Sequence, residues 1–120
     1  MQQKINFKEK LSLFSEHWTP KIISEFNDNY LKLAKVKGEF VWHDHTNEDE
    51  LFIIIKGELD LVFKDEIINL KEGECFVVPK SVQHKPYAKE ECHLLLVEPK
   101  STKHTGEVND LRTKNKLDWI

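Results

Sequence analysis

Residues 38–50 read GEFVWHDHTNEDE, with two histidines one residue apart and an acidic run that ends where an apolar segment begins. Side chains on one face of a strand repeat every two residues, so His43 and His45 would point to the same side. A turn over 46–49 would bring the chain back and place Glu50 beside them. The stretch therefore predicts that two imidazoles and a carboxylate meet at one point.

A further histidine, His84, follows a turn over 79–83 and opens a strand of its own. We expect one divalent metal ion to be held by the set His43, His45, Glu50 and His84. Three imidazoles and one carboxylate suit Mn, Fe, Co, Ni, Cu or Zn, whereas Ca and Mg prefer all-oxygen shells. In an octahedral shell, two positions stay open for water or substrate. Because imidazoles bind metal when neutral, metal occupancy should fall as the pH drops through about 6.5.

A single histidine on a strand face is usually an ordinary surface or core residue, so the assignment depends on the four donors together. The other histidines, His17, His93 and His104, have no such partners in the pattern, and we interpret them as structural or surface residues. Glu48 and Asp49 are interpreted as a solvated loop. The last acid of the run differs from them because it abuts the apolar strand.

Short strands with turn signals every 8–12 residues are typical of sandwiches and barrels, and they surround this stretch. The expected strands cover residues 21–26, 30–37, 40–43, 51–55, 59–63, 67–70, 75–78, 84–88 and 93–97. Residues 4–16 predict a short helix or an extended arm. Since the pattern shows no central helix, it favours an all-β fold over a βαβ fold.

The strand over 51–55 is apolar throughout, although a sheet with one wet face alternates apolar and polar residues. Both of its faces should therefore be covered. One face can line a barrel interior, and the other needs a second sheet, the N-terminal arm or a second subunit. Together with Trp18, Trp119 and Ile120, which look exposed near the chain ends, this strand leads us to expect a homodimer.

Two segments carry a resemblance to a known family. Residues 38–57 resemble the first cupin motif, which consists of a glycine, a short strand, His-x-His, a short spacer, a glutamate, six further residues and a second glycine. Here the glutamate is Glu50 and the second glycine is Gly57. Residues 73–84 are similar to the second motif, with Pro79 in register. The chain over about 30–98 is thus identified as a member of the small single-domain cupins, which are often labelled phosphomannose-isomerase-like.

This resemblance implies a cupin double-stranded β-helix, or jelly-roll barrel, and the four metal ligands named above. It implies a single domain over 1–120, with a barrel core at about 21–99, an arm or short helix at 1–20 and a tail at 100–120. The sequence departs from the motifs in three places: Gly38 stands one residue closer to the first histidine, Ser81 replaces a glycine, and Ala88 replaces a common asparagine.

Cupins include dioxygenases, isomerases, epimerases, decarboxylases and pure binding domains, so the fold does not choose the function. If Glu50 points inward, so do Phe52 and Ile54, and the metal would have an apolar wall, which either fills the barrel or receives substrate. A divalent ion with one glutamate leaves a formal charge of +1, which suits a small anionic or carbonyl-containing ligand. Because side chains alternate along a strand, Lys85 and Tyr87 should point away from the side of His84 and the metal. No general base for an isomerase is therefore identified.

Two hypotheses follow. The first is a metalloenzyme acting on a small metabolite, either dioxygenase-like or sugar-phosphate-isomerase-like. The second is a non-catalytic module that binds or senses a small molecule. We favour the enzyme.

Composition excludes several other classes of partner. The 120 residues carry a formal net charge of −3, without the basic excess of a nucleic-acid-binding protein. No apolar run reaches the roughly 20 residues that span a bilayer, and the N-terminus lacks a secretory signal, so we expect a cytoplasmic protein. The two cysteines, Cys75 and Cys92, are interpreted as reduced, small hydrophobic residues in strands.

Overall fold

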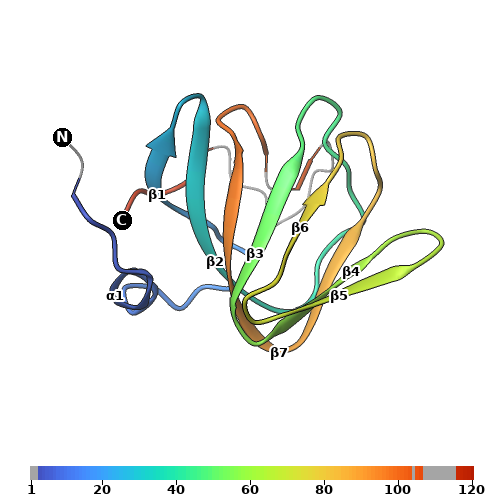
Figure 1. Ribbon diagram of the computed structural model, residues 1–120, viewed down its shortest axis with the longest axis horizontal. Coiled ribbons are helices and arrows are strands. Elements are labelled where there is room, and N and C mark those ends of the chain that lie inside the picture. The colour runs from blue at the N-terminus through green and yellow to red at the C-terminus, as the bar shows by residue number, and fades with distance from the viewer. Residues whose placement is uncertain (1–2, 104, 107–115) are drawn as a thin grey trace.

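The structure is a computed structural model that describes residues 3–103, 105–106 and 116–120. One short helix and seven strands form its ordered elements (Figure 1). Their bounds are α1 (Phe7–Leu11), β1 (Lys21–Phe26), β2 (Asn29–Glu39), β3 (Glu50–Lys56), β4 (Glu58–Val62), β5 (Ile67–Lys71), β6 (Cys75–Val78) and β7 (Lys85–Pro99). None of the described residues belongs to a helix with the length and apolar character needed to cross a membrane.

Strand β7 is the centre of the sheet. It pairs with β2 along one edge, and along the other edge its second half pairs with β3 and its first half with β4. The main path of the sheet runs β1-β2-β7-β3-β6, while β4 also pairs with β5, and every strand pairing is antiparallel. The prediction of an all-β fold is confirmed.

The turn from β3 to β4 depends on a glycine. Gly57 has φ +85°, a conformation that L residues with side chains rarely adopt. A Cβ at this position would lie 3.1 Å from the carbonyl oxygen of Glu91, in the middle of β7. The two strands can therefore pass this closely only because the position has no side chain.

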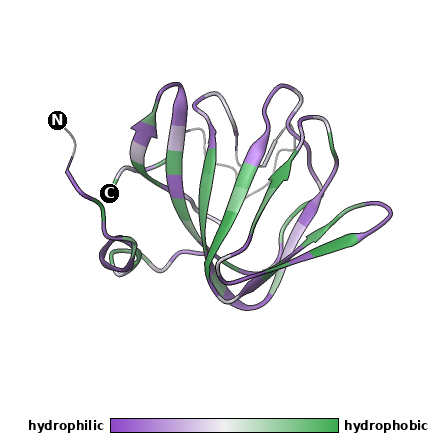
Figure 2. Ribbon diagram, viewed as in Figure 1, coloured by the Kyte–Doolittle hydropathy of each residue, from purple (hydrophilic) through white to green (hydrophobic). Residues whose placement is uncertain are grey.

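The main hydrophobic core lies inside the folded sheet. It is built from the inward faces of β2, β3, β4 and β7, with contributions from β5 and β6. Figure 2 shows the apolar residues along the middle of these strands and polar residues at the turns. The buried members are Ala34, Val36, Phe52, Ile54, Leu59, Leu61, Leu70, Val78, Ala88, Cys92, Leu94 and Leu96.

A second, smaller core covers the outer face of the sheet. Leu11 at the end of α1 and Phe14 just after it pack with Leu33 and Leu95, and the outward side chains of β3 join this cluster. The helix begins at Phe7 and is capped by Asn6, whose side chain accepts a hydrogen bond of 3.0 Å from the backbone N–H of Glu9. The sequence allowed a second sheet, the N-terminal arm or a second subunit to cover the outer face of β3. Among the described residues, the N-terminal arm covers it.

Several expected elements differ in extent. The strand expected at 40–43 is reduced to one isolated bridge between His43 and His84, and the strands expected at 84–88 and 93–97 are a single strand, β7. The helix expected within 4–16 has five residues. The expected tail over 100–120 is described only in part, and Leu111 and His104 lie outside the described residues.

The described end of the tail extends the sheet beside β1. The N–H of Ile22 donates to the carbonyl of Asp118 at 2.9 Å, and the N–H of Ile120 donates to the carbonyl of Ile22 at 3.0 Å. Between these bonds, Trp119 meets the ring of Tyr30 edge to face, with centroids 5.7 Å apart. Residues 116–120 therefore lie against the β1–β2 hairpin.

The two cysteines differ in their surroundings, which leads to a testable difference. Both cysteines lie in strands, as expected, but Cys75 opens β6 and is exposed, whereas Cys92 is fully buried in β7. Burial, and then the charge of Glu58, raises the pKa of the Cys92 thiol to about 12.

Because the thiolate is the reactive form, an aromatic disulfide reagent should label one thiol per folded chain and the second only in denaturant. Rapid labelling of both thiols, or of any thiol in Cys75→Ser, would contradict this placement of β7.

Candidate metal centre

The four predicted metal donors come from three segments of the chain. His43 and His45 lie in the loop that follows β2, Glu50 is the first residue of β3, and His84 directly precedes β7. The two histidine segments are joined by a pair of backbone hydrogen bonds, from the N–H of His43 to the carbonyl of His84 at 3.0 Å and in return at 2.9 Å. This bridge brings the two sequence motifs together.

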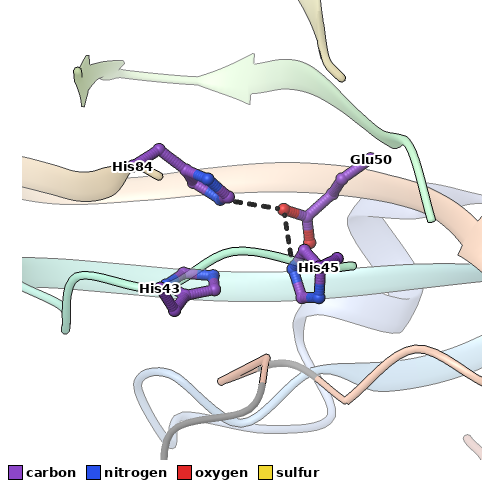
Figure 3. A group of neighbouring side chains, drawn as sticks. All are labelled: His43, His45, Glu50 and His84. Atoms are coloured by element: carbon purple, nitrogen blue, oxygen red, sulfur yellow. Dashed lines mark ion pairs between the residues drawn. The ribbon is translucent and has the colours of Figure 1, made fainter. Parts of the chain in front are cut away.

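The side chains of the four residues converge (Figure 3). One donor atom from each lies within 4.8 Å of the donor atoms of all the others. Oε1 of Glu50 lies 3.4 Å from Nε2 of His45 and 3.3 Å from Nε2 of His84. All four residues are buried, with exposed fractions of 4% or less.

Backbone carbonyls fix the orientation of two of the imidazoles. Nδ1 of His43 lies 2.9 Å from the carbonyl oxygen of Val41, and Nδ1 of His84 lies 2.9 Å from that of Val82. A carbonyl can only accept, so each Nδ1 carries the proton and each Nε2 keeps its lone pair. This outer hydrogen bond is the usual support of a metal-binding histidine.

Three buried polar atoms of the cluster have no hydrogen-bond partner among the described residues. They are Nε2 of His45, Oε1 of Glu50 and Nε2 of His84. Buried polar atoms are normally satisfied, and these atoms point toward a common centre. The group could therefore hold a metal ion, and its three imidazoles and one carboxylate fit a divalent transition metal.

Electrostatics favour a neutral His43 and an ionised Glu50. Burial, and then the nearby His84, lowers the pKa of His43 to about 4. Burial alone would raise the pKa of Glu50, but the close imidazoles of His45 and His84, together with Glu98, hold this pKa well below its usual value. Burial likewise opposes protonation of His45, but the nearby carboxylate of Glu50 raises its pKa. The proton that competes most directly with a metal is therefore the one on His45.

A buried ion pair behind the cluster was not identified in the sequence. Nζ of Lys32 lies 2.7 Å from Oε1 of Glu98, and the two residues are each 1% exposed. Burial, followed by the negative charge of Glu50, raises the pKa of Glu98 well above its usual value, and Lys32 opposes this shift. The one signal in the sequence for a buried acid at this position was that Glu98 directly follows the apolar run 94–97 and precedes Pro99.

Aromatic side chains form one wall of a small cavity beside the four candidate donors. This cavity, of about 40 Å³, is lined by His43 and Glu50 together with mainly apolar side chains from the barrel interior. Trp18 stacks on Phe40 with centroids 4.6 Å apart, and Phe40 meets His43 edge to face at 5.5 Å. The indole N–H of Trp18 donates to the carbonyl of Lys37 at 2.9 Å. Trp18, expected near the surface, instead packs against the inner core.

The expected parity of β3 is observed. Phe52 and Ile54 are buried on the same face as Glu50, and Phe52 lines the cavity. Lys85 points away from the metal donors, as expected, and its Nζ lies 3.3 Å from Glu39. No lysine or tyrosine is among the residues that line the cavity.

The loop that carries the ligands is tied to the turn before His84. Ser81, where the motif has glycine, adopts φ +68°, so the glycine conformation is retained. Its N–H donates to the carbonyl of His45 at 2.8 Å, and its hydroxyl donates to that of Thr46 at 3.2 Å. Asp49 is solvent-accessible, but its carboxylate accepts the N–H of Lys80 at 2.9 Å and so has a structural role beyond a solvated loop.

The other described histidines meet at a surface carboxylate. Nε2 of His17 and Nε2 of His93 each lie 2.7 Å from an oxygen of Glu91. These contacts lower the pKa of Glu91 to about 2. Within the described residues, this trio is not among the groups with metal-binding geometry, which agrees with its interpretation as structural.

Comparison with known proteins places this arrangement in context. A family model described as Cupin domain matches residues 30–98. A crystal structure of a cupin-2 domain containing protein from Shewanella frigidimarina is 53% identical, with a TM-score of 0.79, over 80% of this chain and 94% of that chain. A crystal structure of a Neisseria meningitidis protein is 35% identical, with a TM-score of 0.75, over 81% and 99%. The uncharacterized protein YdbB of Bacillus subtilis (strain 168) is 43% identical over 79 residues, which span 65% of this chain and 64% of that relative's length.

Proposed function

Because the chain belongs to the cupin domain family, whose model matches residues 30–98, we propose that it is a metal-binding cupin acting on a small metabolite. Its ion is held by His43, His45, Glu50 and His84. The observation that carries this proposal is the set of buried donor atoms that lack hydrogen-bond partners among the described residues and converge within 4.8 Å. The ion is one of Mn, Fe, Co, Ni, Cu or Zn.

The chain's own residues prepare the site for such an ion. The carbonyls of Val41 and Val82 hold two imidazoles in the metal-binding tautomer. The apolar cavity under Trp18 and Phe40 keeps bulk water away from the face of the cluster that it covers. When bound, the ion supplies Lewis acidity at its open coordination positions.

The cavity lining favours dioxygenase-like chemistry over sugar-phosphate isomerisation. A sugar phosphate needs cationic and hydrogen-bonding partners, and moving its proton needs a placed base. The described cavity lining is almost entirely apolar, and its ionisable members, His43 and Glu50, are assigned to the metal. We infer a small, largely apolar substrate whose anionic or carbonyl oxygen binds the ion. The same shortage of acid–base groups supports the second candidate, a module that binds a small ligand without turnover.

Metal analysis tests the proposal directly. Protein purified without chelator or nickel resin should contain close to one transition-metal ion per chain, and His43→Ala/His45→Ala should contain almost none. His17→Ala/His93→Ala is the matched control, because it removes two imidazoles at the surface carboxylate instead. Circular dichroism verifies folding of each variant. Equal metal content in the wild type and the His43→Ala/His45→Ala variant would overturn the assignment.

Turnover separates the two candidate functions. With the identified metal restored, small diketones and diols are tested for oxygen uptake, and sugar phosphates are tested for isomerisation. Oxygen consumption that disappears in His43→Ala/His45→Ala supports the enzyme. Saturable binding of the same compounds without any turnover supports the binding module.

Metal affinity should depend on pH in a defined direction. The pKa of His45 is raised, so its proton competes with the ion at a higher pH than the proton of a free imidazole would, whereas the proton of His43, with a pKa of about 4, competes only at acidic pH. Below the pKa of His45, the apparent metal affinity should therefore fall about tenfold for each unit of pH decrease. Competition with a coloured chelator between pH 5 and 8 measures this slope. A constant affinity across that range would contradict the role of His45.

A further inference from the structure

Strand β6 ends the main path of the sheet and leaves a backbone edge open (Figure 1). Among the described residues it pairs only with β3, whereas the β1 end of the path is covered by residues 118–120. Open strand edges are normally protected by lysine, proline or a bulge, because they can pair with another chain. The four residues of β6, CFVV, include neither lysine nor proline, and their pairing with β3 has no register shift.

The backbone groups on this open edge belong to Cys75 and Val77. The N–H of Ile54 in β3 donates to the carbonyl of Glu74 at 2.9 Å, so the bonding groups of Ile54 face β6. Bonding directions alternate from residue to residue in an antiparallel ladder, so Phe76, two positions beyond Glu74, also bonds towards β3. The N–H and C=O of the residues on either side of Phe76 therefore point away from β3 and can bond to a further strand.

The side chains of the same two residues are apolar and uncovered. Cys75 is exposed, and Val77 is 51% exposed. They lie opposite Ile53 and Leu51, which are half-buried on the outer face of β3. The edge therefore combines free backbone hydrogen-bonding groups with apolar side chains, and an added strand would use both.

Opposite charges stand at the two ends of this edge. Glu72 and Glu74 directly precede β6 and Lys80 follows it, and all three residues are exposed. A second copy of the edge running antiparallel to the first would bring each acidic end to the basic end of the other. A parallel arrangement would bring like charges together, which is unfavourable. The edge is thus complementary to itself, which favours a second copy of this chain as its occupant.

We propose that the protein forms a homodimer in which the β6 strands of two copies pair antiparallel across a twofold axis at Phe76. Cys75 of each copy then lies opposite Val77 of the other, and each such pair exchanges both of its N–H···O bonds. Glu72 of each copy lies opposite Lys80 of the other. Because the same edge serves both copies, the contact closes on itself and adds no further chains.

This interface differs in place from the one that the sequence suggested. The sequence pointed to the apolar strand at 51–55 and to the chain ends, whereas the contact lies at the neighbouring edge strand. It involves none of the four candidate metal donors and goes beyond the function proposed above. Pairing over a four-residue strand buries an area at the low end for specific interfaces, so we expect a reversible dimer. The thiol of Cys75 stays on the outer face of the joined sheet, where the labelling reagent can reach it.

Sedimentation equilibrium of the full chain in reductant tests the dimer. The wild type should approach twice the mass of one chain at high concentration and dissociate on dilution. Val77→Lys places a charge in the seam at an exposed position, so the dissociation constant should rise at least about tenfold. Ile67→Lys is the matched control, because it makes the same kind of change at a residue 61% exposed on β5, and it should stay within about twofold of the wild type.

Charge reversal tests the antiparallel direction. Lys80→Glu and Glu72→Lys should each weaken the dimer severalfold at low ionic strength, because each change brings like charges together at both ends of the seam. Both changes in one chain should restore the wild-type affinity to within about twofold, since opposite charges then face each other again. Circular dichroism verifies folding, and these exposed changes decide the question even if Val77→Lys disturbs the strand.

Oxidation tests the register of the two strands. Val77→Cys places a thiol opposite Cys75 of the second copy, where Cα atoms about 5.5 Å apart suit a disulfide, so mild oxidation should yield a covalent dimer. Val77→Cys/Cys75→Ser should run as a monomer on a non-reducing gel, because its thiols then lie diagonally across the axis, beyond the reach of a disulfide.

A monomer at every concentration would overturn the proposal. A dimer that Ile67→Lys weakens as much as Val77→Lys, or that the combined charge reversal fails to restore, would also overturn it, because the contact would then lie elsewhere. A covalent dimer from Val77→Cys/Cys75→Ser would place the strands in a different register and would contradict the twofold axis at Phe76.

Discussion

Replacing Glu98 with leucine is expected to lower the free energy of unfolding by about 3–5 kcal/mol, since it leaves one charge of a buried pair without its partner. In the wild type, the ammonium of Lys32 lies 2.7 Å from this carboxylate, and the lysine is 1% exposed. Urea unfolding at pH 7 measures the loss.

The double variant Lys32→Met/Glu98→Leu separates loss of the pair from loss of packing. Replacing both members of a buried ion pair with apolar residues of similar size is often neutral or stabilising, so this variant should recover most of the lost stability. If the double variant is no more stable than Glu98→Leu, the penalty does not come from the stranded charge.

Removing the indole of Trp18 is expected to cost about 3 kcal/mol, in the range for aromatic-to-alanine changes in cores. Trp18→Ala loses the stacking contact with Phe40 and the hydrogen bond to the carbonyl of Lys37. It also opens the cavity beside the metal donors. Urea unfolding gives the stability change, and a chelator should strip metal faster from this variant than from the wild type.

Trp42→Ala is the matched control for that change. Trp42 is 42% exposed, and Nζ of Lys85 lies over its ring, 5.6 Å from the ring centroid. Its removal should cost less than about 1 kcal/mol and leave metal release unchanged. If both tryptophan variants release metal at the same rate, Trp18 does not limit access to the site.

The convergence of the four candidate donors could be predicted because their signals are local. The spacing of His43 and His45 fixes a common direction, and Glu50 directly precedes an apolar strand whose parity was then observed. The position of His84 was supported by its turn and by the resemblance to the second cupin motif. The all-β class followed from short strands and frequent turns, which also lie within short windows of sequence.

What could not be predicted depends on long-range pairing. Lys32 alternates with leucines in its strand, and such a pattern is typical of a lysine facing water, but the arm covers the leucine face and Lys32 is buried on the other face. Its partner Glu98 is 66 positions away, and no local pattern links the two. The union of two expected strands into β7 likewise depends on pairing with β2 and β4.

Strand β7 has a consequence for how the protein is made. It is the final strand to leave the ribosome, yet β2, β3 and β4 all hydrogen-bond to it, and His84 directly precedes it. The earlier strands must therefore wait, with their apolar faces unshielded, until translation passes residue 99. Non-local pairing of this kind slows folding and favours protection of the nascent chain by chaperones. Barrel closure and any loading of the ion are thus expected only after residue 99 has left the ribosome.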